Sequence, residues 1–153
     1  NQIVVAYGVG SQPQIRIFTA QGKIVSAFLA YEKSFLGGLA LAVGNLDGRA
    51  GYNQDEIIVA PLGGREALVK VFDNRAKLKS NFLAFGRNWR GGINLAVGDL
   101  DSDGLAEIVT AARPGATPHV RVFDEQGIVK QSFYAWLDDF NGGVNSGIIK
   151  INN

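Results

Sequence analysis

The sequence predicts an all-β fold, a β-propeller built of four-stranded antiparallel blades, with three repeat units in this chain. Two short strand-like motifs each occur three times, and the segments between them carry turn residues and show no helical period. Each unit offers four short strands. Four-stranded meanders that repeat roughly every 40–55 residues are typical of propeller blades.

Two motifs define the repeat. The first is a strand of alternating apolar and basic residues that ends in Phe, and it occurs at 15–18, 69–72 and 120–123. The second is an aromatic strand that precedes a Gly-Gly pair, and it occurs at 27–31, 81–85 and 132–136. The extra residues of the middle unit fall at 49–54, in one loop. Repeats tolerate insertions that are confined to a loop, so we expect the three units to share one structure.

We expect a single domain over 1–153, with repeats at approximately 1–38, 39–92 and 93–143. Because 144–150 aligns with 93–99, and 2–6 aligns with 107–111, residues 144–153 are expected to complete the unit begun at residue 1. Three units are fewer than the 4–8 blades of most propellers. The ring could be completed by further blades of a longer chain or by copies of this chain in a homo-oligomer. The missing initiator Met favours the longer chain.

Composition narrows the classes of partner. The 15 Lys and Arg residues nearly balance the 14 Asp and Glu residues, so the overall charge does not indicate nucleic acid. The chain has no Cys, which excludes disulfides, thiolate metal sites and thiol nucleophiles. No apolar run approaches the ~20 residues that a membrane-spanning helix needs. We therefore expect no nucleic-acid partner and no membrane span.

The third repeat contains acidic residues at alternate positions between two strands. Calcium takes six to eight oxygens at about 2.3–2.6 Å, and such a loop can supply them. The loop lacks the twelfth-position Glu and the flanking helices of an EF-hand. A solvated acidic turn is the alternative, since Asp and Gly are common turn residues. The ligands that we expect for a structural Ca²⁺ are Asp99, Asp101, Asp103, Leu105 through its carbonyl, and Glu107.

A second loop in the middle repeat matches this pattern less well. Asn45 and Asp47 stand at equivalent positions, but the insertion replaces the third acid and Asp55 follows late. We expect any ion held by Asn45, Asp47 and Asp55 to bind more weakly than the ion of the third repeat.

No catalytic residues are expected. His119 is the only histidine, and one His without Cys cannot assemble the usual zinc site. No Gly-x-Ser-x-Gly motif supports a nucleophilic Ser. The loops at the end opposite the acidic loop combine aromatic residues with Arg, a composition common in binding surfaces. The contact residues predicted there, for a protein or glycan partner, are Tyr7, Arg65, Arg87 and Arg113.

The chain resembles the FG-GAP (integrin-α-type) repeat family, which includes the bacterial VCBS repeat proteins. The matching residues lie at 97–104, 107–110 and 118–124, and the resemblance covers essentially the whole chain. It implies a β-propeller with calcium loops between the first and second strands of certain blades. It also implies a secreted or cell-surface protein that acts in adhesion or recognition. Glu107 departs from this family, which more often has Asp at that position.

Two other functions remain as alternatives. A carbohydrate-binding, lectin-like propeller would stack aromatic side chains such as Trp89 on sugars. A propeller-based polysaccharide-degrading enzyme would need convergent acids and a base, and the sequence offers no such group outside the acidic loop. A non-enzymatic, calcium-stabilised recognition module is the function that the sequence favours.

Overall fold

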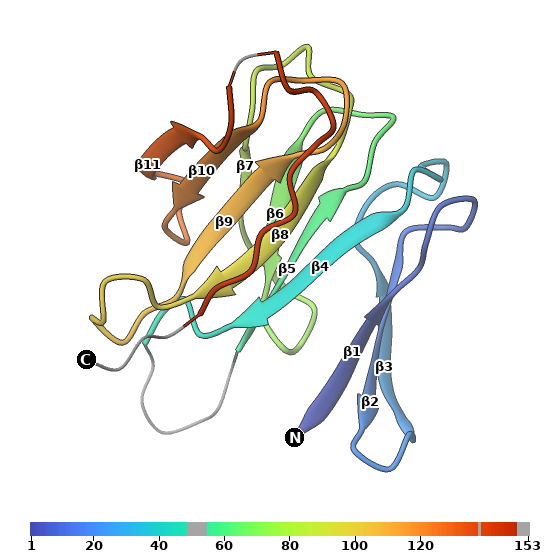
Figure 1. Cartoon of the computed structure of the whole chain (residues 1–153). Coiled ribbons are helices and arrows are strands. Elements are labelled where there is room, and N and C mark those ends of the chain that lie inside the picture. The colour runs from blue at the N-terminus through green and yellow to red at the C-terminus, as the bar shows by residue number, and fades with distance from the viewer. Residues whose placement is uncertain (49–54, 138, 150–153) are drawn as a thin grey trace.

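The computed structural model describes residues 1–48, 55–137 and 139–149. Within these residues the chain forms eleven strands and no helix, and the strands form three antiparallel sheets (Figure 1). The expectation of an all-β protein with antiparallel sheets is confirmed. The sheets do not close into a ring within one chain. In the described part of the chain, no helix is long and apolar enough to cross a membrane.

The three sheets follow one another along the chain. The first has three strands in the order β1-β2-β3, which are β1 (Gln2–Ala6), β2 (Gln14–Thr19) and β3 (Ile24–Leu29). The second has the order β4-β5-β6-β7, with β4 (Leu39–Gly44), β5 (Glu56–Pro61), β6 (Leu68–Phe72) and β7 (Leu78–Leu83). The third has the order β11-β10-β9-β8, with β8 (Ile93–Gly98), β9 (Glu107–Ala112), β10 (His119–Phe123) and β11 (Val129–Tyr134).

The outer hairpin has the same irregularity in each sheet. The register shifts immediately before a Phe, at Phe18 in β2, Phe72 in β6 and Phe123 in β10. The following turn places one residue at positive φ, which is +82° at Gly22, +66° at Ala76 and +84° at Gly127. Gly adopts this conformation at least cost, because it has no Cβ. The repeated sequence therefore gives a repeated local structure, down to the bulge and its turn.

Two hydrophobic clusters lie between successive sheets. The cluster between the first and second sheets contains Ile15, Ile17, Ile57, Val59 and Phe72. The cluster between the second and third sheets contains Val69, Val71, Ile93, Ile108 and Phe123. β5 is buried along its whole length between these clusters, and β9 is buried equally. Both strands are continuous apolar or β-branched runs after their first residue, as expected for strands covered on both faces.

Residues 144–149, the last described segment, lie apart from β1 (Figure 1). β1 is the edge strand of the first sheet. Residues 144–149 form no strand and run beside β8, where Asn94 Nδ2 donates a hydrogen bond to the Val144 carbonyl at 2.7 Å. The structure thus does not join residues 144–149 to β1 within one chain. Residues 150–153 lie outside the described residues.

Candidate metal centre

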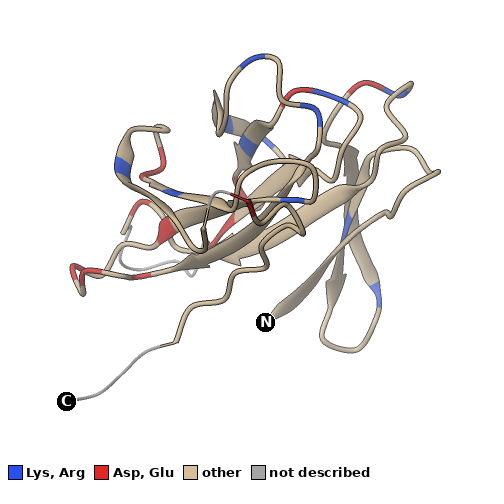
Figure 2. Ribbon diagram, turned by 45° about the horizontal axis from the view of Figure 1, so that its top comes forward, with Lys and Arg blue, Asp and Glu red and all other residues tan. Residues whose placement is uncertain are grey.

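Three carboxylates converge at the turn between β8 and β9. One oxygen each from Asp99, Asp101 and Glu107 lies within 4.8 Å of the others. Asp99 and Asp101 are exposed, whereas Glu107 is only 3% exposed. Figure 2 shows this acidic turn projecting from one end of the third sheet. The alternation of acids along the turn therefore produces a real cluster, which combines two exposed carboxylates with a buried one.

Hydrogen bonds within the turn hold its acidic side chains in place. The N–H of Gly104 donates to Asp99 Oδ2 at 3.0 Å, and the N–H of Leu105 donates to Asp103 Oδ1 at 2.8 Å. Ser102 and Gly104 have positive φ values of 64° and 91°, which tighten the turn. Asp side chains commonly accept hydrogen bonds from the backbone two residues on, as Asp103 does here. The conformation of the turn is therefore stabilised by hydrogen bonds from its backbone to its own Asp side chains.

Glu107 links the turn to the sheet. Its Oε2 accepts a hydrogen bond from the Leu100 N–H at 2.8 Å, and its Oε1 lies 2.6 Å from the Lys130 ammonium. A buried carboxylate is stable only when it is paired and hydrogen-bonded. Both conditions hold for Glu107, which closes the loop across the end of β9.

Lys130 on β11 is the cation that the acidic cluster already contains. Its ammonium bridges Glu107 and Asp101, with the Asp101 Oδ2 at 2.8 Å. Hydrogen bonds to these two carboxylates raise the pKa of Lys130 above its usual value. The hydrogen bond from Lys130 in turn lowers the pKa of Asp101. One ammonium thus offsets part of the repulsion among the three carboxylates.

The second sheet contains an equivalent pair of a buried Glu and a Lys. Glu56 is 2% exposed, and its Oε2 accepts a hydrogen bond from the Leu46 N–H at 2.9 Å. Lys79 on β7 contacts its Oε1 at 2.9 Å. Lys79 and Lys130 each occupy the second position of the last strand of their sheets. This shared position is the signal in the sequence that could have identified both lysines, and the sequence analysis missed it.

The acidic cluster has the span and the charge that calcium requires. Ligand oxygens on opposite sides of a calcium ion are about 4.6–5.2 Å apart, twice the usual Ca–O distance. The three carboxylate oxygens lie within 4.8 Å of one another, so they are close enough together to contact one such ion. Lys130, whose side chain is 36% exposed, would have to move aside for an ion to reach Glu107 and Asp101 together. Calcium bound there would supply charge neutralisation, while the chain's own residues would hold the turn.

Asp103 and Leu105 are joined by a hydrogen bond within the turn, and their roles as calcium ligands stay predictions. Asp103 does not belong to the group of converging carboxylates. Instead its Oδ1 accepts the hydrogen bond from the Leu105 N–H, which shapes the turn. The structure therefore brings together three of the expected side chains and uses Asp103 as a support for the loop.

The second predicted loop is divided between two places. Asp47 lies 2.9 Å from the Lys79 ammonium, and the Asn45 side chain accepts a hydrogen bond from the Gly48 N–H at 3.0 Å. Asp55 lines a separate cavity beside the first sheet. Residues 49–54, which connect these parts, lie outside the described residues. The weaker ion site at Asn45, Asp47 and Asp55 therefore stays a prediction.

The residues predicted for partner binding lie in loops at the opposite end of the sheets from the acidic turn. Arg65 is held within the chain, because its Nη1 donates to both carboxylate oxygens of Glu32 at 2.7 and 2.8 Å. Its guanidinium also lies 4.6 Å from the centre of the Tyr31 ring. The hydrogen bond from Arg65 lowers the pKa of Glu32. Arg65 therefore ties the loops of the first and second sheets together.

The other three predicted contact residues differ in accessibility. Arg113 is half-buried, and its Nη1 donates to Asn94 Oδ1 at 3.3 Å. Tyr7 is exposed, and the Arg16 guanidinium lies 5.2 Å from its ring centre. Arg87 is exposed. Of these four predicted contact residues, Arg87 and Tyr7 have exposed side chains.

Comparison with family models, with curated proteins and with solved structures finds no match for this chain. The resemblance to FG-GAP and VCBS repeats therefore rests on the residues alone. What that resemblance implies about ligand, partner and location stays a prediction.

Proposed function

We propose that the chain is a non-enzymatic β-propeller repeat module, stabilised by calcium, that acts in adhesion or recognition as a secreted or cell-surface protein. The convergence of Asp99, Asp101 and Glu107 at one turn carries the calcium part of the proposal. An ion there would cancel the repulsion among these acids and fix a hairpin end that has little apolar contact of its own. This role is structural.

The propeller part of the proposal is supported by repetition. Three sheets share one strand order, one bulge position and one turn conformation. Successive sheets pack face to face through apolar clusters. Blades of a propeller have the same meander and the same mutual packing. The secreted or cell-surface location is supported only by the resemblance to FG-GAP repeats.

The recognition surface in this proposal is the rim that carries Arg87 and Tyr7. Arg and Tyr are enriched in protein interfaces, where each offers a large contact area with a polar end. Arg87 is exposed in the loop between β7 and β8. A protein or glycan with acidic groups fits this chemistry.

Thermal melting in calcium and in chelator tests the calcium site. At a calcium concentration 100-fold above the dissociation constant, binding stabilises the folded chain by about 2.7 kcal/mol. For a domain of this size that corresponds to a rise in Tm of roughly 5–10 °C over the value in EDTA. Asp101→Ala removes one ligand, so its Tm is expected to be nearly the same in both solutions.

Asp139→Ala is the matched control, because Asp139 is an exposed acid outside the acidic turn. This variant should keep the full calcium-dependent rise in Tm. Equal melting of the unsubstituted chain in calcium and in EDTA would remove calcium from the proposal and leave the sheet architecture intact.

A further inference from the structure

Successive sheets meet through one set of contacts that is used twice. An aromatic residue of the last strand of each sheet packs on the Phe at the bulge of the next sheet. Phe28 lies 5.0 Å from Phe72 between ring centres, and Phe82 lies 4.7 Å from Phe123. The repeated residue that would continue this series on the third sheet is Phe133. The bulge Phe of the first sheet, equivalent to Phe72 and Phe123, is Phe18.

A basic side chain crosses each interface at the same place. Lys70 Nζ donates to the Ala30 carbonyl at 2.9 Å, and Arg121 Nη1 donates to the Ala84 carbonyl at 2.7 Å. The third basic residue of the series is Arg16, whose Nε donates within its own strand to Gln14 Oε1. The third acceptor of the series is the carbonyl of Ala135. The outer faces of the first and third sheets therefore each carry one half of a further interface of the same kind.

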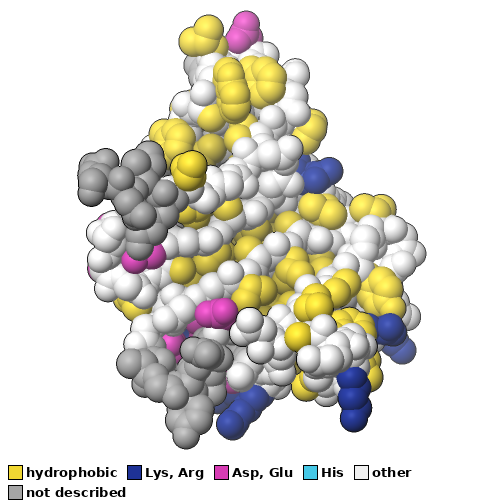
Figure 3. All heavy atoms as spheres, turned by 60° about the horizontal axis from the view of Figure 1, so that its bottom comes forward, with side chains coloured by type: hydrophobic (Ala, Val, Ile, Leu, Met, Phe, Trp, Pro, Cys, Tyr) yellow, Lys and Arg dark blue, Asp and Glu magenta, His cyan; other side chains and the backbone are white. Residues whose placement is uncertain are grey.

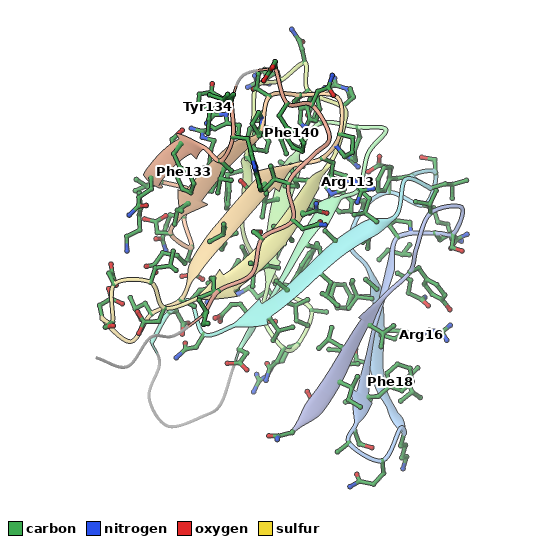
Figure 4. All side chains as sticks on the ribbon, viewed as in Figure 1. Arg16, Phe18, Arg113, Phe133, Tyr134 and Phe140 are labelled. Atoms are coloured by element: carbon green, nitrogen blue, oxygen red, sulfur yellow. The ribbon has the colours of Figure 1, made fainter. Side chains whose placement is uncertain are left out.

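The free face of the first sheet is the half that offers Arg16 and Phe18. Figure 4 shows both side chains on the side of this sheet that faces away from the second sheet. Ile3 on β1 is 50% exposed, whereas its counterpart in β5, Ile57, is 2% exposed beneath the first sheet. Val5, the next residue on this face, is also exposed. The equivalent face of the second sheet is buried by a neighbouring sheet, and the first sheet has no such neighbour on this face.

The free face of the third sheet is the complementary half. Phe133 is 48% exposed (Figure 4), and Ala135 is exposed although its counterparts Ala30 and Ala84 are buried. Beside them runs an open apolar groove lined by Val109, Val122, Phe133, Trp136, Val144 and Ile148. Figure 3 shows hydrophobic side chains gathered across the middle of one face of the molecule. Exposed apolar patches of this kind mark interaction sites.

Residues 144–149 already occupy the place of a next innermost strand. A Cβ on Gly98 would meet Ile148, just as a Cβ on Gly44 would meet Val97 of the following sheet. The Val144 N–H donates to the Ala112 carbonyl at 2.8 Å, as the Leu39 N–H donates to the Tyr7 carbonyl at 3.3 Å. What this segment lacks is a second strand. What β1 lacks is the innermost strand that β4 and β8 provide to β5 and β9.

We propose that this free edge and these two faces bind a second copy of this chain, head to tail. Residues 144–149 of one copy pair antiparallel with β1 of the other, and the third sheet of the first copy packs on the first sheet of the second. The register of β8 with β9 transfers to this pair as Ser146 opposite Val5 and Ile148 opposite Ile3. Phe133 then stacks on Phe18, and Arg16 donates to the Ala135 carbonyl.

Two copies suffice to cover the free faces of the first and third sheets and the free edge of β1 described above. A contact between different patches gives a ring only when the rotation closes. Two copies of three sheets make six sheets, each four-stranded once β1 has its partner, which lies within the 4–8 blades of known propellers. Pairing also removes the exposed edge of β1, which would otherwise invite uncontrolled strand addition. The proposal does not rest on calcium binding.

The mass of the 153-residue chain in solution, measured by sedimentation or light scattering, is the first test. A value of twice 16.4 kDa is expected. Phe133→Asp places a charge at the centre of the interface and should give a monomer that retains the β-sheet circular dichroism. Ile128→Asp is the control, since Ile128 is an exposed turn residue whose counterpart Lys77 stays exposed between sheets. A monomer for the unsubstituted chain, or loss of the dimer in the control, overturns the proposal.

Disulfide crosslinking tests the register. The chain has no Cys of its own, so Val5→Cys with Ser146→Cys introduces the only thiols. Opposed Cβ atoms of a strand pair lie within disulfide reach. Mild oxidation should therefore give a band of twice the monomer mass on a non-reducing gel. Val25→Cys with Ser146→Cys, on the exposed last strand of the first sheet, should stay monomeric on the gel. Equal crosslinking in both variants, or a ladder of higher species, contradicts the two-copy ring.

Discussion

Single residues decide how this chain responds to pH, and His119 is the clearest case. Its Nε2 lies 2.7 Å from Ser132 Oγ, and its ring stacks on Tyr134 with 4.7 Å between ring centres. Burial, and then the positive charge of Arg121, lower the pKa of His119 below its usual value. The folded chain therefore favours the neutral imidazole. The equivalent residue of the first sheet is Gln14, which keeps a polar side chain without a titrating group.

His119→Gln should flatten the acid limb of the stability curve. Below a pH of about 6.5 the unfolded chain takes up a proton on His119 before the folded chain does, so the free energy of unfolding falls as the pH is lowered. Urea midpoints at pH 7.5 and pH 5.5 measure this loss in the two proteins. The variant is expected to lose less stability between the two pH values. An identical loss in both proteins would contradict the low pKa.

The residues of the acidic turn show how far sequence reaches at this scale. Asp99, Asp101 and Glu107 could be predicted as a group, because alternate positions in a tight turn bring side chains together. The repeated position of Lys130 is visible in the sequence, but its contact with Glu107 is not, because that contact depends on how β11 lies beside β10 and β9. Arg65 was expected at a binding surface, yet it pairs with Glu32 in the neighbouring unit. A partner from another unit cannot be seen within one motif.

At the scale of elements, an ion pair between a buried Glu and a Lys joins each acidic hairpin to the outer strand of its sheet. Glu56 and Glu107 each begin the second strand of their sheet, and each accepts one backbone N–H from the preceding loop. Lys79 and Lys130 reach them from the outermost strand. Lys79 also contacts Glu125 of the third sheet. Although burial acts to lower the pKa of Lys79, its hydrogen bonds to Glu125, Glu56 and Asp47 outweigh that effect and raise it.

Lys79→Met should destabilise the chain by about 3 kcal/mol, because it leaves the buried Glu56 carboxylate without a cation. The free energy of unfolding from urea titration measures this cost. Lys77→Met changes an exposed Lys in the adjacent turn, so it should change the stability by less than about 0.5 kcal/mol. Equal effects of the two substitutions would show that Lys79 does not stabilise Glu56.

At the scale of the whole molecule, the repeated sequence predicts an all-β chain of antiparallel sheets, and the structure agrees. The repeats carry this information because each motif folds locally into the same hairpin and bulge. The placement of the chain ends could not be predicted in the same way. Residues 144–149 align with an innermost strand, but they lie on the third sheet and their partner strand is absent from it. No single repeat encodes which strand pairs with residues 144–149, because the described residues contain no such strand.

Calorimetric titration of calcium into the unsubstituted chain and into Lys130→Met tests the central claim, that the acidic turn is a calcium site with Lys130 as its internal competitor. The unsubstituted chain is expected to bind one ion, with a dissociation constant on the order of 0.1–1 mM, as in other weak calcium modules. Lys130→Met should bind roughly tenfold more tightly, a gain of about 1.4 kcal/mol. Absence of binding heat in both proteins would contradict the account and leave Lys130 as the only cation that Asp101 and Glu107 hold.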